Sequence, residues 1–265
     1  MNNEHYSKRL ARMAAFALPF LGLMGLESIA QQEPDLDYEP TIEEPVYALN
    51  QGPRIGIDEA HVNFHKANGR YKPFTKLLER DGYRVSRFRK AFAEKRLSAI
   101  DILVIANPLH QRNDRNWKLP TPSAFTDAEI EAVDAWVHAG GRLLLIADHM
   151  PFPGGAAKLA ETFGFRFSNG FARYPGERRG LPDRFEAGVG LIESALTQGR
   201  SETERVHSVA TFTESAFLAP KAAQPILRFG PGAFSLEPQV AWKFDNQTPK
   251  TDIAGWLQGA YLIWG

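Results

Sequence analysis

Three short apolar runs in the sequence each end in side chains that could bind or transform a ligand. The runs cover residues 54–57, 100–106 and 142–147, and the polar residues that follow them are Asp58, Glu59, His61, Asn63 and His65, then Asn107, then Asp148 and His149. Carboxylates and imidazoles can accept protons or coordinate a metal ion, and an asparagine amide both donates and accepts hydrogen bonds. The candidates for a catalytic acid or base are Glu59, Asp148 and His149.

The elements that would position these residues alternate along the chain. Each run is short enough to be a buried parallel strand, and residues 83–88 have a further strand pattern. Helical patterns occur at residues 73–80, at 92–97, between the capping box of Thr126 and Glu129 and the Gly140-Gly141 pair, and at 156–163. This order predicts an α/β fold, namely a flavodoxin-like three-layer sandwich with a mostly parallel sheet. The pattern is looser beyond Gly164, where residues 205–211, 216–218 and 225–229 resemble strands.

Parallel strands present their carboxyl-end loops along one edge of the sheet, where ligands bind in open α/β folds. We therefore expect the polar residues to converge there on a small ligand. The candidate ligand-binding residues are Asp58, Glu59, His61, Asn63, His65, Tyr71, Asn107, Asp148 and His149.

A metal site is one interpretation of this cluster. His61 and His65 are four residues apart, which would place both imidazoles on one face of a helix. Together with Asp148 and His149 they are candidate ligands for a divalent zinc or manganese ion. The alternative is that the carboxylates bind backbone amides and the histidines belong to a buried polar network. The spacing matches no closed metal motif, so both interpretations stay open.

Composition and the N-terminal region bear on where the protein acts. Residues 1–30 have the basic, apolar and small-residue regions of a signal peptide, so we expect a periplasmic or secreted protein. If the signal peptide is not cleaved, it would be the protein's only attachment to the membrane. Residues 31–52 are acidic and contain prolines, as in an extended tether, and residues 53–265 form a single α/β domain. Lys and Arg total 31, as do Asp and Glu, so the charge does not favour binding to nucleic acid.

The chain resembles the class I glutamine amidotransferase-like superfold. More narrowly, it resembles an uncharacterised bacterial family of unknown function that is related to the gliding-motility and intraflagellar-transport (GIFT) domains. The resemblance covers most of residues 54–235, and its motifs are residues 58–65, 69–71, 105–108, 123–126, 140–141, 144–154, 194–200 and 209–213.

The resemblance implies a fold and limits the chemistry. In the amidotransferases the strand after the Gly-Gly helix ends in a nucleophilic cysteine, whereas the corresponding stretch here continues into Asp148 and His149. The whole sequence has no cysteine, so glutamine amidotransferase activity is excluded. Relatives of the GIFT type are regarded as non-catalytic, with a suggested role in binding sugars or other ligands.

These observations favour an exported protein that binds a small or carbohydrate-like ligand without thiol chemistry. One alternative is a metal-dependent envelope hydrolase in which a metal ion activates water. Another is an interaction module with a protein partner in an envelope or transporter assembly. The apolar stretch near Gly265 has no polar cap, which suggests that the natural chain continues beyond it.

Overall fold

The central element of the fold is a five-stranded sheet. The computed structural model describes residues 33–175, 182–258 and 261–264. The strands of this sheet are β1 (Arg54–Asp58), β2 (Arg84–Phe88), β3 (Ile102–Ala106), β4 (Arg142–Ile146) and β15 (Tyr261–Trp264). Their spatial order is β15, β4, β3, β1, β2; the last four are parallel, and β15 pairs antiparallel with β4. The prediction of four parallel strands in one sheet is confirmed.

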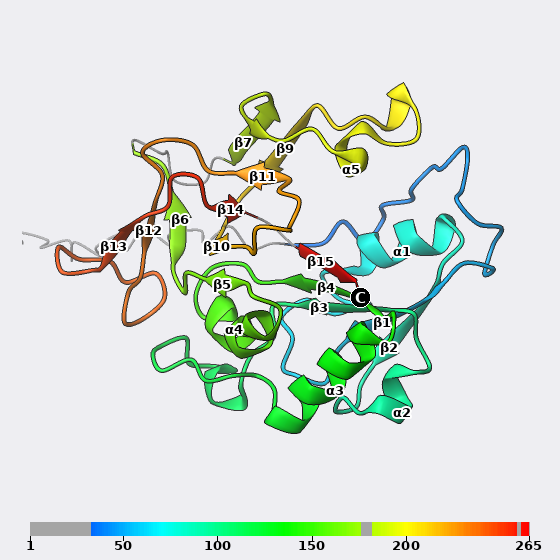
Figure 1. Cartoon of the computed structure of the whole chain (residues 1–265), viewed down its shortest axis with the longest axis horizontal. Helices are drawn as coiled ribbons and strands as arrows, with labels where there is room; N and C mark the ends of the chain where they lie inside the picture. The colour runs from blue at the N-terminus through cyan, green and yellow to red at the C-terminus, as the bar shows by residue number, and fades with distance from the viewer. Residues whose placement is uncertain (1–32, 176–181, 259–260, 265) are drawn as a thin grey trace, which may run out of the picture. The chain divides into compact units, whose positions relative to one another are not determined.

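Helices cover both faces of this sheet (Figure 1). They are α1 (Lys72–Arg80), α2 (Glu94–Leu97), α3 (Asp127–His138) and α4 (Phe152–Thr162). The strands are buried on both faces: Leu103 and Leu143 belong to the core under α3 and α4, whereas Ile57 and Val104 pack with Phe74 of α1. Such burial explains why the strands are continuous apolar runs.

Helix α4 begins earlier than the sequence pattern predicts, and it contains the Gly154-Gly155 pair. A Cβ atom on Gly154 would lie 1.9 Å from Thr121 Oγ1, and one on Gly155 would lie 2.5 Å from the carbonyl oxygen of Pro108. These glycines therefore allow close packing of the first helical turn on the neighbouring loop. Pro153 is compatible with that turn because a first-turn residue needs no hydrogen-bonded N–H.

The second half of the chain is rich in short strands, and most of them pair antiparallel. A seven-stranded sheet has the order β5, β10, β14, β11, β8, β7, β9, and a three-stranded sheet has the order β13, β12, β6. The bounds are β5 (Arg166–Phe167), β6 (Phe171–Arg173), β7 (Asp183–Ala187), β8 (Gly190–Leu191), β9 (Ser208–Thr211), β10 (Ala216–Leu218), β11 (Leu227–Arg228), β12 (Phe234–Leu236), β13 (Lys250–Asp252) and β14 (Leu257–Gln258), with short helices at Gln111–Asn113, α5 (Ala195–Gln198) and Glu202–Glu204. The structure is thus α/β with one four-stranded parallel array and further sheets.

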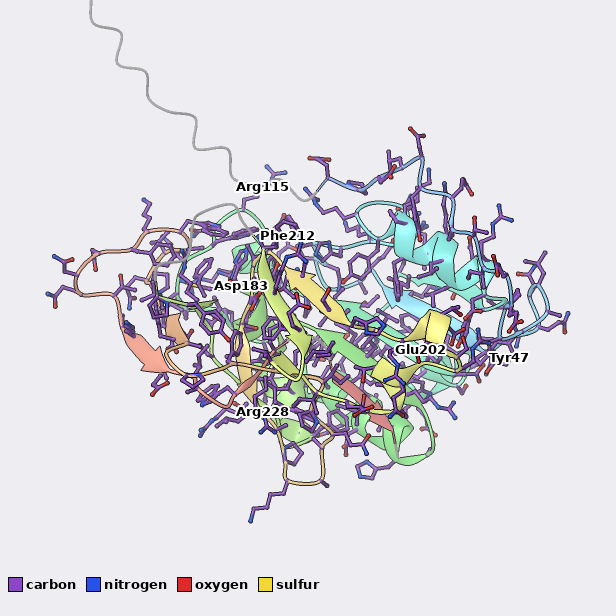
Figure 2. All side chains as sticks on the ribbon, turned by 90° about the horizontal axis from the view of Figure 1, so that it is seen from above. Tyr47, Arg115, Asp183, Glu202, Phe212 and Arg228 are labelled. Carbon is purple, nitrogen blue, oxygen red and sulfur yellow. The ribbon has the colours of Figure 1, made fainter. Side chains whose placement is uncertain are left out.

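The described part of the expected tether, residues 33–52, has no helix or strand and contacts the domain. Tyr47, which Figure 2 labels, packs edge to face on Tyr83 with ring centroids 5.2 Å apart, and the Val46 N–H donates to Asp81. The expected signal peptide, residues 1–30, lies outside the described residues. Within the described ranges, no helix has the length and apolar character needed to span a membrane.

Candidate functional site

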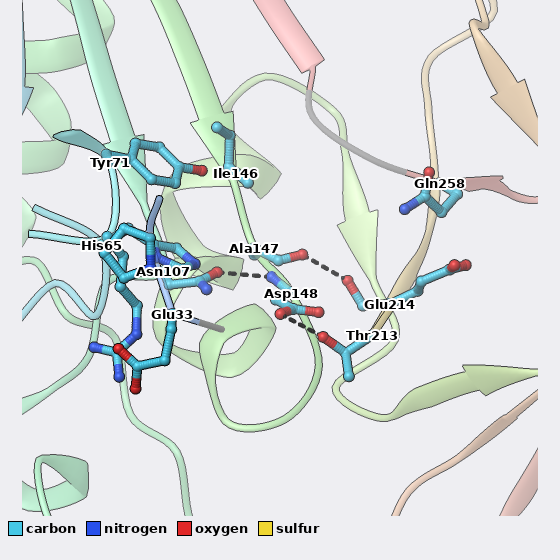
Figure 3. A pocket seen from close by; sticks show the side chains of 13 residues that line it. Glu33, His65, Tyr71, Asn107, Ile146, Ala147, Asp148, Thr213, Glu214 and Gln258 are labelled. Carbon is cyan, nitrogen blue, oxygen red and sulfur yellow. Dashed lines mark hydrogen bonds between the residues drawn. The ribbon is translucent and has the colours of Figure 1, made fainter. Parts of the chain in front are cut away.

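A pocket of about 330 Å³ lies at the carboxyl edge of the parallel sheet (Figure 3). Its floor comes from the ends of β3 and β4, and its walls come from the loop after β1, the turn between β9 and β10, strand β14 and the start of the described chain. The lining residues are Glu33, Pro34, His65, Arg70, Tyr71, Asn107, Ile146, Ala147, Asp148, Thr213, Glu214, Ser215 and Gln258. The expected convergence of strand-end residues is therefore present for His65, Tyr71, Asn107 and Asp148.

Hydrogen bonds fix Asp148 at the exit of β4. Its Oδ2 atom accepts a hydrogen bond from Thr213 Oγ1 at 2.8 Å, and its backbone N–H donates to Asn107 Oδ1 at 2.8 Å. Its Oδ1 atom accepts from the backbone N–H of His149. Asn107 has a φ of 49°, in the left-handed region, where asparagine is tolerated better than most residues. This conformation lets one side chain contact the exits of β3 and β4 together.

Three buried side chains in the pocket each have a polar atom with no hydrogen-bond partner. These atoms are His65 Nδ1, Asn107 Nδ2 and Gln258 Oε1, in residues that are 7%, 1% and 9% exposed. Buried polar atoms in folded proteins are almost always paired, because an unpaired one costs about 1–3 kcal/mol. All three atoms belong to side chains that line one pocket, which makes it the candidate ligand site.

His65 and Tyr71 are both uncharged at neutral pH. Burial, with a smaller contribution from the positive charge of Arg70, lowers the pKa of His65 to about 4. Burial and then the negative charge of Asp148 raise the pKa of the Tyr71 phenol. The two rings stack with centroids 4.6 Å apart at 14°, so each fixes the orientation of the other. The pocket therefore offers a neutral imidazole, which can donate or accept depending on its tautomer.

Asp58, His61 and Asn63 do not line the pocket, because they form a buried network with the N-terminus of α3. His61 Nδ1 lies 2.9 Å from Asp58 Oδ2, and His61 Nε2 lies 2.8 Å from Glu129 Oε1. Asn63 Nδ2 donates to Asp58 at 2.9 Å. Burial lowers the pKa of His61, but hydrogen bonds and charge from Asp58 and then Glu129 outweigh it, so the pKa is raised. The alternative interpretation of these residues, a buried polar network, is the one that the structure shows.

Glu59 and His149 also lie outside the pocket. Glu59 is paired with Arg87 at 2.7 Å and accepts from the backbone N–H of Ala67. His149 is 5% exposed, and its Nδ1 atom lies 2.7 Å from the carbonyl oxygen of Met150. Its ring stacks on Phe171 at 4.7 Å. Asp148 therefore lines the pocket, whereas His149, the next residue, packs among aromatic rings.

The candidate metal ligands are not brought together. The segment from His61 to His65 is not helical, so its two imidazoles do not share a helical face: His61 contacts two carboxylates, and His65 stacks on Tyr71. His149 packs among aromatic rings. In the part of the chain that the structure describes, no group of three or more His, Cys, Asp and Glu side chains is arranged to hold a metal ion. The polar groups that line the pocket are amides, a neutral imidazole, hydroxyls, carboxylates and the guanidinium of Arg70.

Several lining residues were not predicted as site residues from the sequence. Arg70 and Thr213 fall within the motifs that carry the family resemblance. The resemblance therefore pointed to their segments but assigned these two residues no role. Glu214, Ser215 and Gln258 had no such signal. Gln258 reaches the pocket only because β14 pairs antiparallel with β10 and β11, which no local pattern reveals.

The fold is similar to that of the mmIFT52 N-terminal domain, with a TM-score of 0.51 and 14% sequence identity over 68% of this chain and 74% of that chain. A putative ThuA-like protein from Bacteroides uniformis ATCC 8492 aligns with a TM-score of 0.41 and 15% identity over 70% of this chain and 71% of that one. At such identities, the likeness to the mmIFT52 domain shows a shared fold alone. No protein-family model and no curated protein match the chain.

Proposed function

We propose that the protein binds a small carbohydrate-like ligand in the pocket at the carboxyl edge of the parallel sheet. The observation that carries this proposal is the set of unpartnered buried atoms His65 Nδ1, Asn107 Nδ2 and Gln258 Oε1. The amide nitrogen of Asn107 needs an acceptor, and the amide oxygen of Gln258 needs a donor. A sugar hydroxyl supplies both, so a polyhydroxylated ligand satisfies these atoms without a formal charge.

The remaining lining is compatible with such a ligand. Ile146 and Ala147 contribute an apolar surface beside the polar groups, as small-molecule sites generally do. The neutral state of His65 leaves it able to exchange hydrogen bonds with hydroxyls at physiological pH. The cavity of about 330 Å³ lies at the small end of the range for ligand pockets, which favours a ligand of one or two sugar rings.

The test measures binding of four neutral sugars by saturation-transfer NMR and calorimetry: glucose, galactose, mannose and N-acetylglucosamine. We expect at least one to bind the wild-type protein. Gln258→Met removes the unpartnered acceptor, so we expect affinity to fall about fivefold while stability stays equal or rises, since no internal bond is lost. The matched control is Gln198→Met, because Gln198 is exposed on α5 outside the pocket and its side-chain hydrogen bond, to Glu193, is at the surface. We expect this control to change neither the affinity nor the stability.

Two results would contradict the proposal. If none of the four sugars binds the folded wild-type protein, the ligand class is wrong. If a sugar binds equally well to wild type and to Gln258→Met, binding occurs elsewhere and the pocket is not the site.

We also propose that the parallel array and its helices are a flavodoxin-like sandwich related to the GIFT domains, in an exported protein. The parallel pairing of β4, β3, β1 and β2 and the similarity to the mmIFT52 domain support the fold assignment. The leader pattern in residues 1–30 supports export, and a chain without cysteine would have no disulfide to form in an oxidising compartment. Expression in a bacterial host, with fractionation and N-terminal sequencing, tests it, and a cytoplasmic, full-length product would contradict it. The hydrolase and the partner-binding module remain alternatives that no observed contact favours.

A further inference from the structure

One wall of the pocket comes from a segment that is itself poorly buried. We call residues 33–39 the strap. Glu33 and Pro34 at its start line the pocket, whereas Pro40 just beyond its other end is buried. Within the strap, Pro34 is half-buried and the other six residues are exposed. Its position over the pocket must therefore be set by specific bonds, since packing contributes little.

Lys76 on α1 supplies these bonds. Its ammonium donates to the carbonyl oxygens of Leu36 at 3.2 Å and Tyr38 at 3.0 Å, and to Glu39 Oε1 at 2.6 Å. An ammonium group has three donors, so all of them are directed to the strap. The Lys76 side chain is 22% exposed, whereas Arg80, which reaches the same carboxylate at 3.4 Å, is 61% exposed. Lys76 is thus the principal anchor, and Arg80 is a peripheral one.

We infer that Lys76 is a positioning residue for ligand binding: by holding the strap against α1 it keeps the wall formed by Glu33 and Pro34 in place. This inference rests on the proposed function of the pocket. Freeing the strap would force the ligand to order this segment on binding, and that entropy cost would weaken affinity. The side chain acts from outside the pocket, since it is not among the lining residues.

The experiment measures affinity for the same four sugars in Lys76→Met, Lys76→Arg and Arg80→Met, with the full chain in each case. We expect Lys76→Met to weaken binding about fivefold, a size consistent with the loss of a partly exposed charged anchor. Lys76→Arg keeps the charge and the donors, so it should restore most of the affinity. Arg80→Met should bind as the wild type does. Amide hydrogen exchange without sugar should be faster in residues 35–39 of Lys76→Met alone.

The outcomes separate failure of the inference from failure of the proposed function. If wild type binds a sugar and Lys76→Met binds it equally well, the strap does not position the wall and the inference is wrong. Equal losses in Lys76→Met and Arg80→Met would also overturn it, because they would indicate a general charge effect. If wild type binds none of the sugars, the proposed function fails first and the inference fails with it. Circular dichroism melting curves verify that each variant is folded.

Discussion

Replacing His61 with glutamine should strongly destabilise the protein, because this imidazole lies between two buried carboxylates. Asp58 is fully buried and Glu129 is 8% exposed, and each contacts a different ring nitrogen of His61. Both nitrogens must carry a proton to donate to both partners, so the folded protein holds an imidazolium. A glutamine amide has no charge and cannot satisfy both carboxylates in the same way.

The size of the effect follows from what each carboxylate keeps. Asp58 retains hydrogen bonds from the backbone N–H of Ala60 and from Asn63 Nδ2, and Glu129 retains the backbone N–H groups of Phe92 and Thr126. Removing one partner of a buried ion pair costs about 3–5 kcal/mol, and these remaining donors place the loss near the lower end. About 3 kcal/mol corresponds to a melting temperature lower by about 6–12 °C in a domain of this size.

The same network predicts how stability depends on pH. The pKa of His61 is raised above its unfolded value of about 6.5, so its stabilising contribution is complete below that pH. The contribution is lost as pH rises through the folded pKa, when the imidazolium gives up its proton. Wild type should therefore lose stability above neutral pH, and His61→Gln should lack this part of the decline.

The assay measures the free energy of urea unfolding of wild type and His61→Gln between pH 5 and pH 9. His138→Gln is the control, because His138 lies on α3, the helix that also carries Glu129, and its side chain is 72% exposed. We expect the unfolding free energy of this variant to stay within about 0.5 kcal/mol of wild type. The reasoning is refuted if His61→Gln is as stable as the control, or if its stability falls with pH as steeply as that of wild type.

Three further predictions concern the pocket and its supports. The His65 ring should titrate near pH 4 in an NMR experiment, and a His65 titration above pH 6 would contradict its burial. Tyr71 should stay protonated at pH 10, where an ordinary tyrosine is half ionised, and Tyr71→Phe should remove a phenol that titrates above pH 10 from the ultraviolet spectrum. Gly154→Ala should cost about 1–3 kcal/mol, because the new Cβ would clash with Thr121; an unchanged thermal melt would show that α4 is not closely packed there.

The sequence predicted the part of the site that depends on strand order alone. Asn107 and Asp148 follow two apolar runs, and parallel neighbours place their carboxyl ends together whatever the loops do. His149 could not be excluded in this way. Its aromatic neighbours, Phe171 and Trp242, come from segments that the local pattern leaves unassigned.

Local patterns located three strands of the second half, β9, β10 and β11, within the predicted stretches 205–211, 216–218 and 225–229, but they did not predict how the antiparallel sheets pair. Strands β8 and β14 were not predicted, because each is only two residues long and too short for an alternating pattern. The start of α4 was misplaced because Gly154 and Gly155 usually mark a loop, whereas their role here is to let a helix approach Thr121 and Pro108. Only the tertiary neighbours distinguish these two uses of glycine.

The pocket joins segments that are far apart in the sequence. Its walls include Glu33 and Gln258, from the two ends of the described chain, and its floor comes from β3 and β4 in the middle. The cavity therefore depends on contacts between segments that are far apart in the sequence, and closing such long loops costs more chain entropy than closing short ones. A molecule bound there would add its binding free energy to these long-range contacts. It would act as a reversible cross-link between the segments of Glu33 and Gln258.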